Sequence, residues 1–281
     1  MQQQGTECEF KDSNSWVILS PIELSIKRKI ESVGTPLKDW DINIYRGVLT
    51  GCNEAFIIST EKRNEILSNC KDDDERIRTE ALIRPILRGR DIKRYSYNWA
   101  GLWLINTHNG VKGRIPRIDI NDYPAVKEHL DKYWDMISSR ADKGDTPYNL
   151  RNCAYLEDFS QPKIVYSEIV REPQFYLDNL GQFYPEATVF IMTGEGINYL
   201  YHVFHTSIVT YIFKRFYAGG GLGEEGYRYK KAFFEKLPIP HNTVSVVINE
   251  ATAEDTIRQM YHLTEEEVSF IESQQKTFHL K

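Results

Sequence analysis

The chain has 281 residues, a formal net charge of −5 at pH 7, 41% hydrophobic and 27% charged residues. This composition is that of an ordinary globular protein with enough chain for one large domain or two smaller ones, and the net charge argues against a uniformly basic nucleic-acid binder. The sequence has no apolar run of about 18 residues and no apolar signal-peptide core, so we expect no membrane span and a cytoplasmic location.

In chain order, the predicted elements are a helix over 21–30 capped by Ser20, strands over 41–48 and 55–58, a helix over 72–84 stopped before Pro85, a strand over 101–106, a helix over 123–140, strands over 162–170 and 187–193, and a helix over 197–216. The strands are rich in β-branched residues, and the helices show apolar residues at spacings of three and four. In the helix over 123–140 these are Val126, Leu130, Tyr133, Trp134 and Ile137.

Residue types that hold metals or form disulfides are scattered. The four cysteines lie far apart with no C-x-x-C pair, which predicts reduced thiols. His202 and His205 could share a helix face, but no carboxylate or cysteine with supporting spacing lies beside them. We therefore expect no metal site in this chain.

Charge is unevenly distributed along the sequence. Glu80 and Asp91 are the acidic residues in a basic stretch that contains Arg76, Arg78, Arg84, Arg88, Arg90, Lys93 and Arg94. Tyr95, Tyr97 and Trp99 follow this stretch, whereas the last 40 residues are mainly acidic. The basic stretch with its aromatic neighbours predicts nucleic-acid backbone binding, with a merely solvated face as the alternative.

A glycine-rich segment, Gly221 to Gly226, matches the G-x-G-x-x-G pattern of dinucleotide and S-adenosylmethionine loops. Such a loop needs a strand before it and a helix N-terminus after it. Here a predicted helix precedes the glycines, and Glu224 and Glu225 would repel phosphate. We therefore interpret the segment as a loop that is either simply flexible or able to approach a ligand backbone, next to a basic and aromatic run.

Six segments stand in a characteristic order: WDINIYRGVLTGCNEAFII (40–58), IRPILRGRDIKRY (83–95), GLWLINTHNG (101–110), TPYNLRNCAY (146–155), PKIVYSEI (162–169) and GLGEEGYRYKKAFFEKLPIP (221–240). Together they resemble the TaqI-like C-terminal specificity domain, which is the target recognition domain of adenine-N6 DNA methyltransferases and Eco57I-type restriction-modification enzymes. The resemblance covers about residues 16 to 240, and TIRQMYHLTEEEVSFIES (256–273) resembles the helical tail that follows such domains.

The resemblance implies an α+β fold with a twisted, mainly antiparallel sheet and packed helices, in which residues 1–240 form the target recognition domain and 241–281 an acidic helical tail. It implies that double-stranded DNA is the partner, together with an N-terminal methyltransferase domain of the same polypeptide. That domain would bind S-adenosylmethionine; we expect no cofactor in this chain. Asp145-Thr146-Pro147-Tyr148 lacks the second proline of the family's catalytic motif, and Asp72 to Asp74 lack a nearby E-x-K, so we expect the chain alone to be no enzyme.

Phosphate contacts set the register of a protein on DNA, whereas arginine and asparagine can read base edges. The candidate DNA-binding residues are Arg46, Thr50, Asn53, Arg88, Arg90, Lys93, Arg94, Tyr148, Asn149, Arg151, Gly221, Gly223, Tyr227, Arg228 and Lys230. Segment 111–122 is a further candidate for base readout. For the first three residues an alternative is open, in which Gly47, Thr50 and Gly51 build a turn and Arg46 pairs at the surface.

Two other functions remain open from the sequence. The first is a protein-interaction module of a phage-defence system, which would bind its partner without DNA affinity and without salt dependence. The second is a nucleotide-binding enzyme that uses Gly221 to Gly226, which bound nucleotide would reveal.

Overall fold

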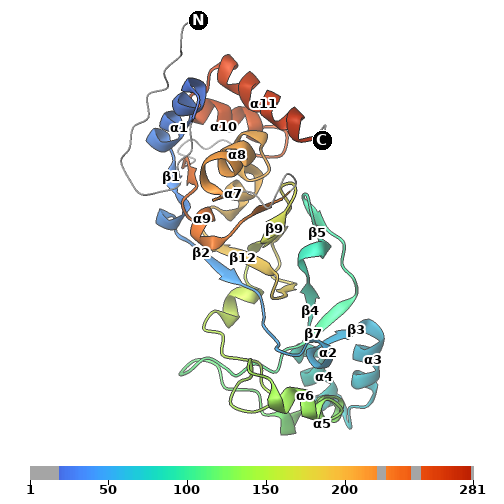
Figure 1. Ribbon diagram of the computed structural model, residues 1–281. Coiled ribbons are helices and arrows are strands. Elements are labelled where there is room, and N and C mark those ends of the chain that lie inside the picture. Colours follow the sequence, from blue (N-terminus) through green and yellow to red (C-terminus); the bar gives the residue numbers. More distant parts are fainter. Residues whose placement is uncertain (1–18, 220–225, 242–247, 280–281) are drawn as a thin grey trace, which may run out of the picture. The chain divides into compact units, whose positions relative to one another are not determined.

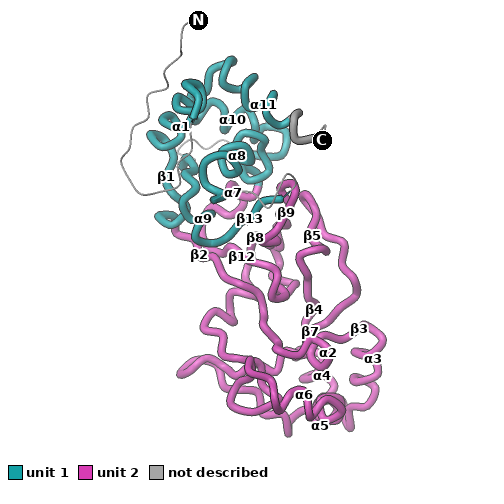
Figure 2. The backbone as a smooth tube through the Cα atoms, in the orientation of Figure 1, with its two compact units in different colours: residues 1–40, 202–281 teal, residues 41–201 magenta. Residues whose placement is uncertain are grey.

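A computed structural model describes residues 19–219, 226–241 and 248–279 (Figure 1). The chain divides into two compact units, Met1–Trp40 with His202–Lys281 (unit 1) and Asp41–Tyr201 (unit 2), coloured separately in Figure 2. The fold is α+β with mainly antiparallel sheets, as predicted. The described part of 241–281 belongs to the same unit as 202–240, so the predicted functional division at residue 240 does not coincide with the units and stays a prediction.

The described elements of unit 1 are α1 (Pro21–Val33), β1 (Thr35–Pro36), a 3₁₀ turn (Leu37–Asp39), α8 (Ser207–Ile212), a π-helical turn (Phe213–Tyr217), β13 (Tyr227–Arg228), α9 (Lys231–Phe234), β14 (Pro238–Ile239), α10 (Ala253–Met260) and α11 (Glu265–His279). Helix α7 (Ile197–Val203) crosses the boundary between the units. The predicted cap of α1 is confirmed, because Ser20 and Glu23 form a reciprocal capping box.

The predicted helix over 197–216 is interrupted. Thr206 caps a new helix, α8, by accepting a hydrogen bond from the Val209 amide at 3.2 Å, and its hydroxyl donates to the Val203 carbonyl at 2.7 Å. The apolar stripe nevertheless stays buried on both sides of the break, as at Phe204 and Ile208.

Helices α10 and α11 are held to the rest of unit 1 by carboxylates. Glu254 accepts hydrogen bonds from the Ser207 and Ile208 amides at the start of α8, at 2.8 and 3.0 Å. Glu267 accepts from Lys29 and Ser25 of α1, both at 2.7 Å. Acidic residues of the predicted tail thus attach α10 to α8 and α11 to α1 within unit 1.

The described elements of unit 2 are β2 (Ile42–Arg46), α2 (Asn53–Phe56), β3 (Ile57–Ser59), α3 (Thr60–Ser68), α4 (Asp73–Leu82), β4 (Ile83–Leu87), β5 (Ile92–Lys93), β6 (Ser96–Tyr97), β7 (Leu102–Ile105), α5 (Pro124–Asp131), α6 (Trp134–Ser139), β8 (Lys163–Ser167), β9 (Ile169–Val170), β10 (Phe175–Asp178), β11 (Tyr184–Pro185) and β12 (Val189–Gly194), with 3₁₀ turns at Gly89–Asp91, Ile120–Asp122 and Leu156–Ser160. Helices α2 to α6 gather beside the β3, β4 and β7 strands (Figure 1).

One four-stranded sheet of unit 2 has the order β10-β8-β12-β2 and is antiparallel throughout. In register, Ile191 of β12 lies between Tyr45 of β2 and Val165 of β8. Lys163 opposes Asp178 across β8 and β10, and the two fully buried side chains form an ion pair at 2.8 Å. The strands predicted over 41–48, 162–170 and 187–193 are confirmed in this sheet as Ile42–Arg46, Lys163–Ser167 and Val189–Gly194. Residues 169–170 form the separate strand β9, which is not part of this sheet.

The second sheet has the order β11-β4-β7-β3, in which only β11 is parallel to its neighbour. Strand β4 was not predicted, since Pro85 lies within it. The proline is tolerated because β11 pairs only with Ile86 and Leu87, so the strand has a free edge at Pro85 within the sheet.

Two other predicted elements differ from the structure. Residues 53–56 form the short helix α2, so the strand expected over 55–58 begins only at Ile57. The helix expected over 123–140 breaks between α5 and α6, and Trp134, which the apolar spacing had placed on its buried face, is 45% exposed.

Candidate nucleic-acid interface

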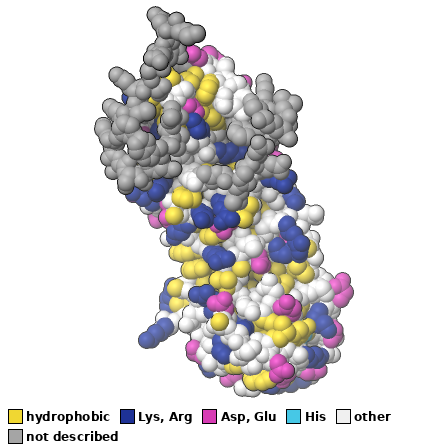
Figure 3. Space-filling view, viewed as in Figure 1, with side chains coloured by type: hydrophobic (Ala, Val, Ile, Leu, Met, Phe, Trp, Pro, Cys, Tyr) yellow, Lys and Arg dark blue, Asp and Glu magenta, His cyan; other side chains and the backbone are white. Residues whose placement is uncertain are grey.

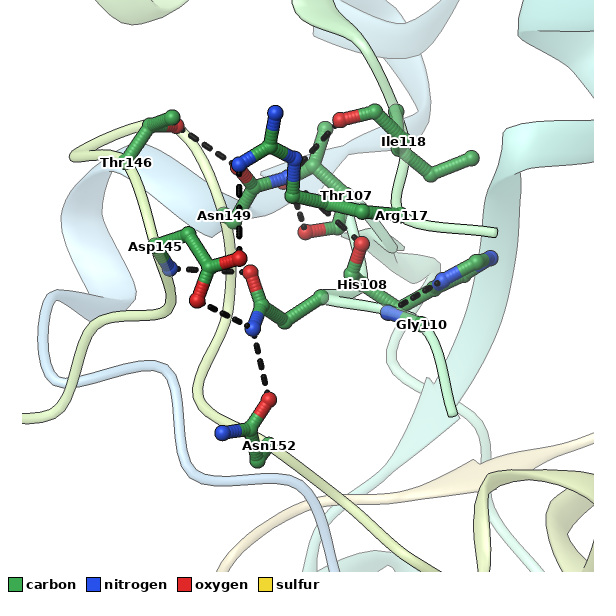
Figure 4. Close-up of polar contacts among 10 residues, drawn as sticks. Thr107, His108, Gly110, Arg117, Ile118, Asp145, Thr146, Asn149 and Asn152 are labelled. Atoms are coloured by element: carbon green, nitrogen blue, oxygen red, sulfur yellow. Dashed lines mark hydrogen bonds and ion pairs between the residues drawn. The ribbon is translucent and has the colours of Figure 1, made fainter. Parts of the chain in front are cut away.

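Two loops of unit 2 are joined by a network of polar side chains (Figure 4), and we call their residues 106–118 and 140–153 the polar loop cluster. Asn109 lies at its centre. Its carbonyl oxygen accepts from the Asp145 amide at 2.8 Å, and its amide group donates to Asp145 at 3.0 Å and to Asn152 at 2.6 Å. Arg117 adds a contact to Asp145 at 3.4 Å. The loop after β7 and the loop after α6 therefore present their side chains as one surface.

Asn149, a predicted DNA contact, supports this cluster from inside. It is 1% exposed, its Nδ2 donates to the Ile118 carbonyl at 2.9 Å, and its Oδ1 accepts from Thr146 at 2.6 Å. The Asn149 amide also closes a turn on the Thr146 carbonyl at 3.1 Å. Since its polar atoms are used within the fold, burial argues against direct DNA contact. The segment that resembled the catalytic motif thus runs into a turn from Thr146 to Asn149.

Arg140 is a residue that sequence reasoning missed. It is 7% exposed and donates to the backbone carbonyls of Thr50, Asp142, Pro147 and Asn149. Its guanidinium also lies 4.3 Å from the centre of the Phe56 ring. Burial lowers its pKa to about 10, so it stays charged at neutral pH. Arg140 thus clamps one loop of the cluster to the chain after β2.

The residues at the end of β2 and directly after it are partly buried supports of the turn and partly exposed side chains. Thr50 is 2% exposed; its hydroxyl donates to Asn53 at 2.5 Å and accepts from the Cys52 amide at 3.2 Å, which favours the turn interpretation for this residue and engages Asn53 in the same turn. Gly47 has to be glycine, because a Cβ there would collide with the Glu186 carbonyl. Arg46 is exposed, and its Nε donates to the Ala187 carbonyl at 2.8 Å.

Arg46 and Arg151, both candidate DNA contacts from the sequence, line the same pocket of about 180 Å³ in unit 2. Asn106 and His108 line it from the end of β7, and Leu156 and Phe159 are among its apolar residues. The pocket is smaller than the roughly 300–1,000 Å³ of sites for drug-sized ligands and cofactors. Arg151 is half exposed and contacts Asp142 at 3.1 Å.

Tyr148 and its neighbours form the outer edge of the cluster. The Tyr148 hydroxyl donates to Asp131 at 2.5 Å, and Lys127 lies 5.4 Å from the centre of its ring. Burial, and to a lesser degree the hydrogen bond to the Asp131 carboxylate, raises the pKa of Tyr148. The hydroxyl therefore stays protonated and able to donate at neutral pH.

The basic stretch of the sequence does not form one face. Arg88 is committed to buried Asp91 at 2.8 Å, whereas Arg90, Lys93 and Arg94 are exposed around the β5–β6 hairpin. At the hairpin turn, Tyr95 has a φ of 61°, which is uncommon for a bulky residue. Figure 3 shows basic side chains interspersed with acidic ones over unit 2 on the face viewed.

The candidates near the glycine-rich segment lie in unit 1. Gly221 and Gly223 fall outside the described residues. Tyr227 is 3% exposed, and its hydroxyl lies 3.3 Å from that of Tyr229, so its ring anchors the chain rather than facing solvent. Arg228 is half-buried, and Lys230 is exposed.

Metal sites and membrane-spanning helices would define other classes of function. Over residues 19–219, 226–241 and 248–279, no group of three or more His, Cys, Asp or Glu side chains is arranged to hold a metal. Within the same described ranges, no helix is long and apolar enough to cross a membrane. Asp72, one of the aspartates considered for a nuclease site, caps α4 by accepting from the Glu75 amide at 2.8 Å.

Comparisons with known proteins relate the chain to restriction-modification systems. Its fold is similar to part of a restriction-modification enzyme, and part of its sequence is homologous to a type II methyltransferase. No protein-family model matches the chain.

The sequence relative is the type II methyltransferase M.PaeR7I of Pseudomonas aeruginosa, which is 22% identical over 183 residues, or 64% of this chain and 29% of the relative. The type IIL restriction-modification enzyme MmeI, solved in complex with DNA, aligns with a TM-score of 0.51 and 12% identity over 78% of this chain and 27% of that one. The type IIG restriction endonuclease BpuSI aligns over 86% of this chain and 28% of its own, with a TM-score of 0.48 and 13% identity. The chain therefore spans less than a third of each relative.

Proposed function

We propose that this chain is the sequence-specific DNA recognition module of a restriction-modification enzyme or adenine-N6 DNA methyltransferase, of the TaqI-like specificity type. It would position target DNA for a methyltransferase domain of the same polypeptide, which would bind S-adenosylmethionine. The observation that carries this proposal is the polar loop cluster, where candidate residues of 111–122 and 146–151 lie together and contact the candidate segment 46–53 in unit 2.

The cluster has the properties that base readout requires. Asn109 is held by three hydrogen bonds, and Arg140 fixes the loop beneath it, so the surface is ordered before any ligand arrives. Polar groups held in place lose less conformational entropy on binding than mobile ones. Asn152 and Arg151 are exposed at the same surface and carry the amide and guanidinium groups that can pair with adenine and guanine.

Ion pairs at this surface leave the arginines available to DNA. Arg117 contacts Asp145 at 3.4 Å and Arg151 contacts Asp142 at 3.1 Å, with all four side chains more than 40% exposed. Exposed pairs of this kind contribute little free energy, about 0–1 kcal/mol. A phosphate or a guanine edge can therefore replace the carboxylate. Arg90, Lys93 and Arg94 at the β5–β6 hairpin would add phosphate contacts that set the register.

The known proteins support the proposal by similarity. The homologous protein is by name a type II methyltransferase, and the enzyme of similar fold was solved in complex with DNA. In each case the matching region is a minor part of a longer protein, as expected for a module that acts with a separate catalytic domain.

The proposal is tested by titrating the chain into labelled duplex DNA over a series of salt concentrations. Binding should be salt-dependent, and Arg46→Gln, Arg117→Gln and Arg151→Gln should each reduce the slope of log K against log salt by about 0.9 if the arginine neutralises one phosphate. Arg28→Gln, an exposed change on α1 of unit 1, serves as the matched control. Salt-insensitive binding of a protein partner with no DNA affinity would instead favour an interaction module.

A further inference from the structure

The pocket that the polar loop cluster lines together with Arg46 contains a side-chain oxygen with no hydrogen-bond partner in the described part of the chain. Asn106 is 7% exposed and lines the pocket, and its Oδ1 is buried with no hydrogen-bond partner among the described residues. Leaving a buried polar atom unpaired is costly, and most such atoms in native proteins have a partner. The Asn106 amide is therefore a polar group at the pocket wall that a bound ligand can pair with.

The other lining groups restrict what this ligand can be. Leu150, Leu156 and Phe159 give the pocket buried apolar surface, which suits an uncharged, flat group better than a phosphate. His108 accepts from the Gly110 amide through Nδ1 at 3.2 Å, and burial lowers its pKa, so the ring is neutral with its hydrogen on Nε2. Asn106 and His108 thus bring a side-chain amide and a neutral imidazole to the pocket lining.

The arginines suggest how such a group would be attached. Arg46 and Arg151 also line the pocket, and both are exposed, so their charges can meet phosphates outside it. A neutral heterocycle with both donors and acceptors, joined to phosphates on either side, is a nucleotide within a DNA strand. At about 180 Å³ the pocket is below the usual range for whole-cofactor sites.

We propose that this pocket receives one unpaired nucleobase of the bound DNA, with Asn106 hydrogen-bonded to the base edge and Arg46 and Arg151 on the flanking phosphates. The proposal rests on the proposed function, because it needs DNA to be held at the polar loop cluster. A base that is already unpaired enters such a pocket without the cost of breaking its pair and stack.

The test compares three duplexes of one sequence: fully paired, with one extra unpaired nucleotide, and with an abasic residue at that extra position. The abasic duplex has the same backbone length and charge but no base to insert. We expect the duplex with the unpaired base to bind about ten-fold more tightly than the abasic one. Asn106→Leu should bring this ratio close to one, and Asn69→Leu, an exposed change on the C-terminal side of α3, should leave it unchanged.

The outcomes separate the two proposals. Equal affinity for the base-containing and abasic duplexes, or a ratio that survives Asn106→Leu, overturns the pocket assignment while DNA recognition stands. Failure to bind any of the three duplexes contradicts the proposed function itself. A thermal unfolding curve for Asn106→Leu confirms that the variant is folded; because the change removes an unpaired buried atom, we expect no loss of melting temperature.

Discussion

Arg88 forks around the carboxylate of Asp91, with Nε donating to Oδ2 at 3.0 Å and Nη2 donating to Oδ1 at 2.8 Å. Asp91 is 4% exposed and also accepts from the Arg88 amide at 2.9 Å. Burial alone would raise the pKa of the Asp91 carboxyl, but the hydrogen bonds and charge of Arg88 hold it below its usual value. Arg88 therefore builds the turn that leads into the basic hairpin.

This pairing predicts different effects for neighbouring arginines. Arg88→Ala leaves a buried carboxylate without its partner and should lower the free energy of unfolding by about 2 kcal/mol. Arg90→Ala, an exposed change two residues away, should stay within about 0.5 kcal/mol of the unchanged chain. Urea denaturation measures both free energies of unfolding. Equal stability of the two variants would show that the Arg88–Asp91 pair contributes nothing to the stability of the fold.

For DNA binding we expect the larger effect from the exposed arginines and the smaller effect from Arg88. Arg90→Ala and Arg94→Ala should each reduce the slope of log K against log salt by about 0.9 if each side chain neutralises one phosphate. For Arg88→Ala we expect no such direct effect on the slope, since its guanidinium faces Asp91. Titrations on duplex DNA across a range of salt concentrations provide the slopes. If the slope of log K against log salt stays unchanged in both variants, the hairpin is a solvent-exposed surface that does not contact phosphates.

The buried pair Lys163 and Asp178 should be essential to the first sheet of unit 2. Lys163→Met removes the charge that Asp178 faces at 2.8 Å and should destabilise the chain by about 3–5 kcal/mol. Lys62→Met, which breaks an exposed pair with Glu65, is the control and should have little effect. Chemical denaturation distinguishes the two, and a mild effect at Lys163 would mean that Asp178 is satisfied by the Gln182 and Phe183 amides alone.

His129 should make stability depend on pH. It is 4% exposed, and burial lowers its pKa, although its Nε2 donates to the Ala55 carbonyl at 3.0 Å. The unfolded chain then binds more protons than the folded chain, so stability falls as pH drops below the unfolded value of about 6.5, down to the lowered folded pKa. His129→Gln keeps a donor without titrating.

The measurement is the denaturation midpoint between roughly pH 7.5 and pH 5, on either side of the usual imidazole pKa. The loss should be smaller in His129→Gln than in the unchanged chain. It should not vanish, because burial lowers the pKa of His108 as well and acts in the same direction. An identical pH profile for both proteins would contradict the assignment.

Much of the fold could be predicted from local sequence patterns. The Ser20 cap and the strands around Ile44, Val165 and Ile191 depend on neighbouring residues, and the structure confirms them. Strand β4 was missed because Pro85 indicated an ending, whereas only the incomplete pairing with β11 explains why a proline fits there. The break at Thr206 was hidden because the apolar stripe continues across it.

The candidate site was harder to predict, because the role of each residue in it depends on contacts with residues far away in the sequence. Thr50 and Asn149 have the polar side chains of a DNA reader, but their partners in the fold bury them. A sequence pattern could have indicated Asn106 and Asn109, since a polar run directly follows the apolar strand over 102–105. Arg140 left none, because four carbonyls from separate turns meet around it.

The most direct test of the central claim, that the polar loop cluster reads DNA sequence, is selection of bound duplexes from a randomised pool by the whole chain, in parallel with its Asn152→Ala variant. We predict that the unchanged chain enriches one short motif, and that Asn152→Ala relaxes one position of it at a cost of about 1–3 kcal/mol. A pool that stays random after selection, or a motif read with equal stringency by the two proteins, would contradict the claim.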